Sequence, residues 1–273
     1  MEKKAKIDLL AIQMSSEIGN LSENVRKVKE LLEENLSKNN ADFVFLPEVW
    51  TSGWDCPSFP FCAEYIDEAT SVSMLCEIAR KYSVNIIGGS FIQKKKNGYL
   101  ANTCPVIDRN GRIITTYEKN HLFSYYGCAE GDYITAGNNP VLVEIEGVKI
   151  GLSICYDIRF PEIYRAYRKA GADILVNMAA WGSDKKIPWD VMTTSRAVEN
   201  QTFFVALTQT GDLKNGANLG HSMIIDYKGD VISEVDKDIA GIFATVDLEE
   251  MYEFRDKCKI LNDIKNSYEV VKK

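Results

Sequence analysis

The chain has 273 residues, 45% of them hydrophobic, and a formal net charge of −7 at pH 7. The hydrophobic content suffices for a sizeable core, and the acidic balance argues against nucleic acid or an anionic membrane surface as a partner. No apolar run is long enough for a membrane span, and no linker, repeat or low-complexity run divides the chain. We therefore expect a single domain over residues 1–273, with neither nucleic-acid nor membrane partners.

Cysteine usage bears on the cellular compartment. The seven cysteines are odd in number and scattered, without a CxxC pair, and only two histidines are available to complete a zinc site. This pattern predicts reduced thiols in a cytoplasmic protein and no metal site.

Strands and helices alternate through the first part of the chain. A buried strand is expected over residues 7–14, followed by a helix whose apolar positions 21, 25, 28, 32 and 36 have helical spacing. Residues 42–48 predict a central parallel strand that ends in the carboxylate of Glu48. An aromatic loop over residues 51–61 follows, which we expect to form a pocket wall. After it come a helix over residues 70–82 and a strand over residues 84–92.

A predicted hairpin over residues 99–107 and 112–118 ends at Lys119. Strands over residues 141–145 and 148–154 then lead to Cys155, and Pro161 suits the first turn of a helix that Gly171 ends. A further strand over residues 172–176 completes a βαβ unit. Cys155 thus lies at the carboxyl end of a strand, where open α/β sheets bind ligands.

The remaining elements predicted are a helix over residues 189–199, a strand over residues 202–208, a hairpin over residues 221–226 and 230–235, a strand over residues 241–246 and a helix from residue 248.

Glu48, Lys119 and Cys155 each follow a strand of what the pattern predicts to be one sheet. A cysteine nucleophile needs a base, donors for the oxyanion and exclusion of bulk water. Glu48 can act as the base, while Lys119 and the backbone N–H of Tyr156 can stabilise the oxyanion. Taken singly, residues of these types are more often an inert buried thiol and two ordinary charged side chains than catalytic groups.

Three blocks of the chain resemble the signature blocks of the nitrilase superfamily of carbon–nitrogen hydrolases, in the family's order. They are Phe45-Leu-Pro-Glu48-Val-Trp-Thr-Ser-Gly, Tyr117-Glu-Lys119-Asn-His-Leu-Phe and Ile154-Cys155-Tyr-Asp-Ile-Arg-Phe-Pro-Glu162, with further matches at Arg196-Ala-Val-Glu199-Asn-Gln and Gly220-His-Ser222. The resemblance covers nearly the whole chain. It implies an α/β fold, a four-layer αββα sandwich, whose subunits pair through the helices that flank the sheets, giving at least a homodimer.

The resemblance also implies a role for each matching residue. Glu48 would be the general base, Lys119 the oxyanion stabiliser and Cys155 the nucleophile, while Glu130 matches a second glutamate that positions Lys119 or the substrate amide. The implied reaction is attack of the thiolate on an amide carbon, loss of ammonia to form a thioester, and hydrolysis by water that Glu48 activates. No metal or organic cofactor is implied.

The blocks around Glu48 and Cys155 resemble the omega-amidase branch, which implies hydrolysis of short dicarboxylate monoamides such as 2-oxoglutaramate. Arg159 can bind a substrate carboxylate bidentately or form a structural ion pair. Four aromatic loop residues are expected either to contact substrate or to pack: Trp54, Tyr125, Tyr126 and Trp181. The chain departs from the family pattern at Met178 and Pro188, both expected on the pocket rim.

Three alternatives remain open at this stage. An N-carbamoyl amino-acid amidohydrolase would use the same catalytic residues on a ureido group, and a true nitrilase is disfavoured because such enzymes carry a different block around the cysteine. A Cys–His hydrolase would instead use His121 or His221 as the base. A non-catalytic binding protein could also have kept the fold.

Overall fold

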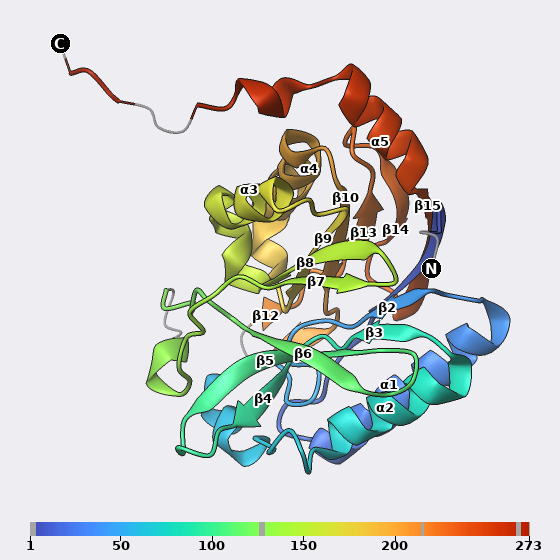
Figure 1. Cartoon of the computed structure of the whole chain (residues 1–273). Helices are drawn as coiled ribbons and strands as arrows, with labels where there is room; N and C mark the ends of the chain where they lie inside the picture. Colours follow the sequence, from blue (N-terminus) through green and yellow to red (C-terminus); the bar gives the residue numbers. More distant parts are fainter. Residues whose placement is uncertain (1–3, 126–128, 214–215, 266–268, 273) are drawn as a thin grey trace.

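The computed structural model describes residues 4–125, 129–213, 216–265 and 269–272. Its strands form two stacked sheets, and helices cover the outer face of each (Figure 1). This is the four-layer αββα arrangement that the family resemblance implies. Among the described residues, every helix is too short or too polar to cross a lipid bilayer.

The first sheet has the strand order β15-β1-β2-β3-β5-β4, with β6 paired to β5. Strands β1, β2 and β3 are parallel neighbours, and β15 closes one edge antiparallel to β1. The bounds are β1 Lys6–Gln13, β2 Phe43–Phe45, β3 Asn85–Ile87, β4 Phe91–Lys94, β5 Leu100–Ile107, β6 Ile113–Glu118 and β15 Ala240–Asp247.

The second sheet has the order β14-β13-β10-β9-β8-β7. Its centre is the predicted βαβ unit, because β8 and β9 are parallel and joined through helix α3. The bounds are β7 Leu142–Ile145, β8 Val148–Ile154, β9 Ile174–Ala179, β10 Phe203–Thr208, β13 Ser222–Ile225 and β14 Val231–Val235, and a separate two-stranded ribbon comprises β11 Asp212–Leu213 and β12 Gly216–Ala217.

Helices α1 and α2 cover the first sheet and α3 and α4 the second, while α5 follows β15 (Figure 1). Their bounds are α1 Leu21–Lys38, α2 Thr70–Tyr82, α3 Pro161–Lys169, α4 Lys186–Asn200 and α5 Leu248–Lys257. The alternation of side chains along β1 explains the layering. Leu9 and Ala11 join the core between the sheets, whereas Leu10 and Ile12 join the core beneath α1 and α2.

Two expectations about the strands were wrong. The predicted strand over residues 84–92 is two strands, β3 and β4, interrupted at Gly88 and Gly89. Glu48 and Lys119 follow strands of the first sheet, whereas Cys155 follows β8 of the second sheet, so the three residues do not share one sheet. Hydrophobic periodicity identifies strands but not the sheet that each strand joins, and both sheets bury continuous apolar runs.

Candidate active site

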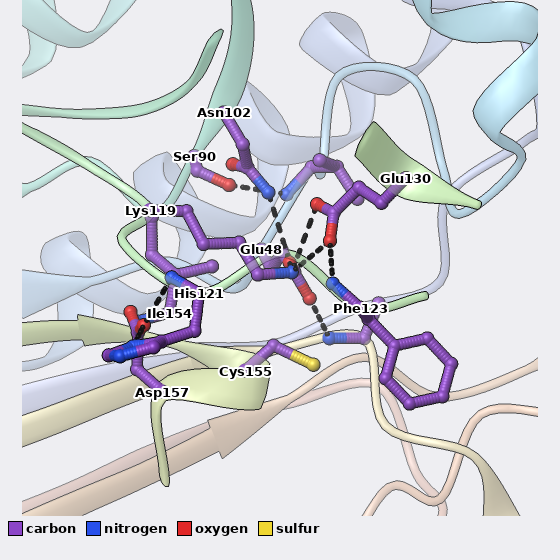
Figure 2. A network of polar contacts seen from close by, with 12 residues as sticks. Glu48, Ser90, Asn102, Lys119, His121, Phe123, Glu130, Ile154, Cys155 and Asp157 are labelled. Carbon is purple, nitrogen blue, oxygen red and sulfur yellow. Dashed lines mark hydrogen bonds and ion pairs between the residues drawn. The ribbon is translucent and has the colours of Figure 1, made fainter. Parts of the chain in front are cut away.

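Glu48 is fully buried where the chain leaves β2. Its Oε1 accepts hydrogen bonds from Asn102 Nδ2 at 3.0 Å and from Lys119 Nζ at 2.9 Å, and its Oε2 accepts the backbone N–H of Ala180 at 2.9 Å (Figure 2). Gln209 Nε2 donates to the Glu48 carbonyl at 2.6 Å. Donors from both sheets therefore fix this carboxylate in place.

Close approach of the backbone shapes this corner. Val49 and Cys155 both have positive φ, at 41° and 46°, although neither is glycine, and such strain is typical of functional sites. Gly89 lies against the segment before Glu48, where a Cβ would stand only 2.2 Å from the Pro47 carbonyl oxygen. Glycine is required there because no side chain fits.

Lys119 is buried between two carboxylates. Its Nζ donates to Glu48 at 2.9 Å and to both oxygens of Glu130 at 3.0 and 2.9 Å, and it lies 5.0 Å from the Trp54 ring centroid. Burial opposes its charge, but Glu130 and Glu48 raise the pKa of Lys119 well above its usual range. Lys119 is thus a fixed ammonium group, and Glu130 lies beside it.

Glu130 begins a short 3₁₀ turn, Glu130–Asp132, and its Oε2 also accepts the backbone N–H of Phe123 at 2.7 Å. Burial raises the pKa of Glu130, an effect that the Lys119 ammonium opposes.

Cys155 follows β8 and starts the 3₁₀ turn Cys155–Arg159, ahead of α3. The thiol lies within hydrogen-bonding reach of Glu48. Burial and the charge of Glu48 raise the pKa of Cys155 well above its usual range, while Lys119 lowers it. The free thiol is therefore protonated near neutral pH and needs a base at the moment of attack, for which Glu48 is placed.

Cys155 opens onto a cavity of about 780 Å³. Arg159, Tyr156 and Trp181 line it, and the guanidinium carbon of Arg159 lies 5.3 Å from the Trp181 ring centroid and 5.9 Å from that of Tyr156. Within the described residues no carboxylate lies within ion-pairing distance of Arg159, so the predicted structural ion pair is not formed. Arg159 is exposed and held by aromatic rings in the cavity wall.

The aromatic loop residues differ in position. Trp54 lines the cavity with Trp181, whereas Tyr125 is 57% exposed and packs against Phe123 and Tyr156 outside the lining. Tyr126 lies outside the described residues.

The expected rim positions of Met178 and Pro188 were wrong. Met178 is fully buried in β9, with its sulfur 3.8 Å from that of Cys104, and Pro188 lies within α4 away from the cavity lining. Met178 faces the core because β9 is buried on both faces.

Neither histidine is placed to serve Cys155. The His121 ring nitrogen Nδ1 lies 2.7 Å from Asp157 Oδ1, and the His221 ring nitrogen Nε2 lies 2.9 Å from Lys186 Nζ. Neither ring has a hydrogen bond to Cys155 in the described part of the chain, so the geometry disfavours a Cys–His hydrolase.

Four residues whose hydrogen bonds position the site were not predicted from the sequence: Asn102, Asp157, Ala180 and Gln209. The available signal for two of them was a polar side chain in an apolar setting. Asn102 interrupts the buried strand β5, and Asp157 stands two residues after the cysteine. Ala180 acts through its backbone, which no side-chain pattern reveals.

The arrangement combines a buried thiol, an adjacent carboxylate, a fixed ammonium group and a cavity onto which the thiol opens. These parts are what acyl transfer through a thioester requires. The carbon-nitrogen hydrolase family model matches residues 10–256 of the chain. The chain therefore belongs to the carbon–nitrogen hydrolase family and is a hydrolase of carbon–nitrogen bonds.

Named relatives cover almost the entire chain. A 2-oxoglutaramate amidase of Bacillus subtilis is 35% identical over 95% of this chain and 98% of its own length. A deaminated glutathione amidase of Dictyostelium discoideum is 31% identical over 97% of both chains. Among solved structures, a CN-hydrolase superfamily protein of Xanthomonas campestris with an arsenic adduct in its active site has a TM-score of 0.88 at 25% identity, covering 98% of this chain and 100% of its own.

Proposed function

We propose that the protein is an omega-amidase-like hydrolase in which Cys155 is the nucleophile, Glu48 the general base and Lys119 the oxyanion stabiliser. The observation that carries this proposal is that Cys155, Glu48 and Lys119 lie together beside the cavity. Hydrogen bonds to Glu48 and Glu130 hold Lys119 there. A small amide is the substrate class that this chemistry fits, and the reaction uses no cofactor.

In the acylation step Glu48 takes the proton of the Cys155 thiol as the sulfur attacks the amide carbon. The oxyanion that forms is stabilised by the Lys119 ammonium and the backbone N–H of Tyr156. Protonated Glu48 then gives its proton to the leaving nitrogen, so that ammonia departs and a thioester remains.

In the second step Glu48 takes a proton from water, which attacks the thioester carbonyl. The same donors stabilise the second oxyanion, and collapse returns a proton to Cys155 and releases a carboxylic acid. Glu130 supports both steps because it anchors Lys119 by two hydrogen bonds and a negative charge.

We propose that the substrate is a short dicarboxylate monoamide such as 2-oxoglutaramate. Arg159 supports this assignment, because it places a guanidinium without a carboxylate partner among the described residues in the wall of the cavity that contains Cys155. Trp181 would fix the guanidinium plane, leaving its N–H edge for the carboxylate at the far end of the substrate. Several relatives are named 2-oxoglutaramate amidase or omega-amidase, which supports the same substrate.

Ammonia release from a panel of compounds tests this function. The panel comprises 2-oxoglutaramate, 2-oxosuccinamate, N-carbamoyl-β-alanine and a simple nitrile, with Cys155→Ala as the control. Release from 2-oxoglutaramate that is absent in the control supports the proposal. Release from the carbamoyl compound alone would move the protein to the N-carbamoyl amino-acid amidohydrolases, and the absence of both ammonia and an acylated Cys155 would favour a binding protein.

A matched pair of substrates isolates the role of Arg159. Arg159→Gln should raise the KM for 2-oxoglutaramate about tenfold or more, because it removes a charge-assisted contact to the carboxylate. The KM for butyramide, which has no carboxylate, should stay within twofold. Equal changes for both substrates would contradict a carboxylate-binding role.

We also propose at least a homodimer, as the family resemblance implies. The apolar side chains Ile187, Val191 and Val198 on α4 are 76%, 59% and 42% exposed, which suits a face covered by a second subunit. Sedimentation at micromolar concentration should give at least twice the mass of one chain. The cytoplasmic location and the single-domain organisation stay predictions.

A further inference from the structure

Asp157 is a fully buried carboxylate that connects the two catalytic segments (Figure 2). Its Oδ2 accepts the Tyr117 hydroxyl at 2.6 Å and the backbone N–H of Ile154 at 2.9 Å. Its Oδ1 accepts the backbone N–H of His121 at 3.0 Å and lies 2.7 Å from His121 Nδ1. One side chain thus receives four hydrogen bonds.

The four donors bracket the catalytic residues. Tyr117 stands two residues before Lys119 and His121 two residues after it, whereas Ile154 immediately precedes Cys155. Tyr117 belongs to β6 of the first sheet and Ile154 to β8 of the second. Asp157 therefore ties the Lys119 segment of one sheet to the Cys155 turn of the other.

The chemistry of the four contacts favours a fixed geometry. An ionised carboxylate only accepts hydrogen bonds, so the ring of His121 must present Nδ1–H toward Asp157. Burial and the charge of Asp157 raise the pKa of Tyr117 well above its usual range, which keeps its hydroxyl protonated as a donor. In the described residues Asp157 has no Lys or Arg partner, so these four donors compensate its burial.

The contact to Ile154 also acts on the backbone of the nucleophile. Cys155 has φ of 46°, a left-handed conformation that is strained for a residue with a side chain. Asp157 reaches back across this residue to the N–H of Ile154 and closes the turn. The turn holds the conformation that directs the thiol toward Glu48.

We propose that Asp157 is a positioning residue that fixes the distance between Lys119 and Cys155, acting through Tyr117 and His121. This inference rests on the proposed roles of Lys119 and Cys155. It does not make Asp157 or His121 catalytic, because their contacts are to each other and to the catalytic segments rather than to the thiol. It assigns His121 a function that differs from the base of a Cys–His hydrolase.

The test removes the partners of Asp157 and not Asp157 itself. Asp157→Asn replaces one acceptor oxygen by an NH2 group, which would then face N–H donors of the backbone. This substitution is expected to destabilise the fold. Tyr117→Phe and His121→Ala each remove one side-chain donor, whereas His121→Asn restores an N–H at about the position of Nδ1. Tyr167→Phe is the matched control, because Tyr167 is also buried, at 2% exposure against 0% for Tyr117, and donates to the Leu152 carbonyl without contacting the Lys119 segment.

Two readouts separate positioning from stability. Misplacement of Lys119 by a fraction of an ångström should lower kcat for 2-oxoglutaramate about tenfold in Tyr117→Phe and His121→Ala, with KM within twofold. His121→Asn should recover at least half of the loss. Tyr167→Phe should lower the melting temperature about as much as Tyr117→Phe does. Its kcat should stay within twofold of the wild-type value.

The rate at which iodoacetamide alkylates Cys155 at pH 7 needs no substrate. It should fall severalfold in Tyr117→Phe and His121→Ala but not in Tyr167→Phe, because Lys119 favours the thiolate. This result would uphold the inference even if no amide in the panel were hydrolysed. The inference is overturned if alkylation and kcat in folded Tyr117→Phe match those of Tyr167→Phe, or if His121→Asn is no better than His121→Ala.

Discussion

Replacing Lys119 by methionine tests the electrostatic balance of the site, because it removes the ammonium group and keeps a side chain of similar length. Glu48 and Glu130 are then left buried without their cation. Breaking a buried ion pair by removing one partner costs about 3–5 kcal/mol in the free energy of unfolding. At pH 8 we expect Lys119→Met to lose this full amount of unfolding free energy. We also expect it to release no ammonia.

The loss should depend on pH in a fixed direction. The pKa of Glu130 is raised by burial and lowered by Lys119, so the substitution raises it further. The folded variant then binds a proton that the unfolded chain, with a carboxyl pKa of about 4.3, has released. A carboxyl pKa that is raised in the folded state stabilises the protein at low pH. This stability is lost as the pH rises toward the folded-state pKa, by about 1.4 kcal/mol per pH unit.

Urea unfolding of wild type and Lys119→Met at pH 6, 7 and 8 measures this effect. The destabilisation should be smaller at pH 6 than at pH 8, and one-proton linkage limits this difference to about 2.7 kcal/mol over two pH units. The double variant Lys119→Met/Glu130→Gln removes the carboxyl that takes up the proton and should show a weaker pH dependence. A destabilisation that stays constant within about 0.5 kcal/mol across this range would refute the reasoning.

Three further predictions concern single contacts. Asn102→Leu removes the donor at 3.0 Å from Glu48 Oε1. It should lower kcat about tenfold, since a hydrogen bond to a charged group contributes about 1.5–3 kcal/mol. An unchanged kcat for ammonia release would contradict this. Gly89→Ala forces a Cβ to 2.2 Å from the Pro47 oxygen at a positive φ and should lower the melting temperature by roughly 4 °C or more in a thermal scan. The rate of Cys155 alkylation by iodoacetamide should still be rising above pH 9, because burial and Glu48 raise the thiol pKa, and a plateau below pH 8 would be inconsistent with that environment.

Local sequence signals predicted most elements and all the residues proposed to react. Helix α2 has the predicted bounds, and β8 ends at Ile154 as expected. Helix α1 begins at Leu21, the first of the predicted apolar positions, and the Asn20 side chain before it accepts the Glu23 N–H. These features depend on periodicity, capping and the contrast between apolar runs and polar ends, which a single sequence contains.

The pairing of the strands could not be predicted in the same way. Strand β15 follows β14 of the second sheet in the chain, yet it pairs with β1 of the first sheet. Nothing local to residues 240–247 encodes that choice, because it depends on packing between distant segments. The assignment of Glu48 and Cys155 to one sheet failed for this reason, although their meeting at one site was predicted.

The division between two sheets explains why so many polar residues are buried around the site. Gln13 of the first sheet accepts the N–H and the hydroxyl of Ser222 in the second, at 3.0 and 2.6 Å, and Gln209 donates across to the Glu48 carbonyl. Apolar packing alone is non-directional and would leave the sheets free to slide by fractions of an ångström. Hydrogen bonds have narrow distance and angle limits, so these cross-sheet contacts convert a packed core into a fixed catalytic geometry.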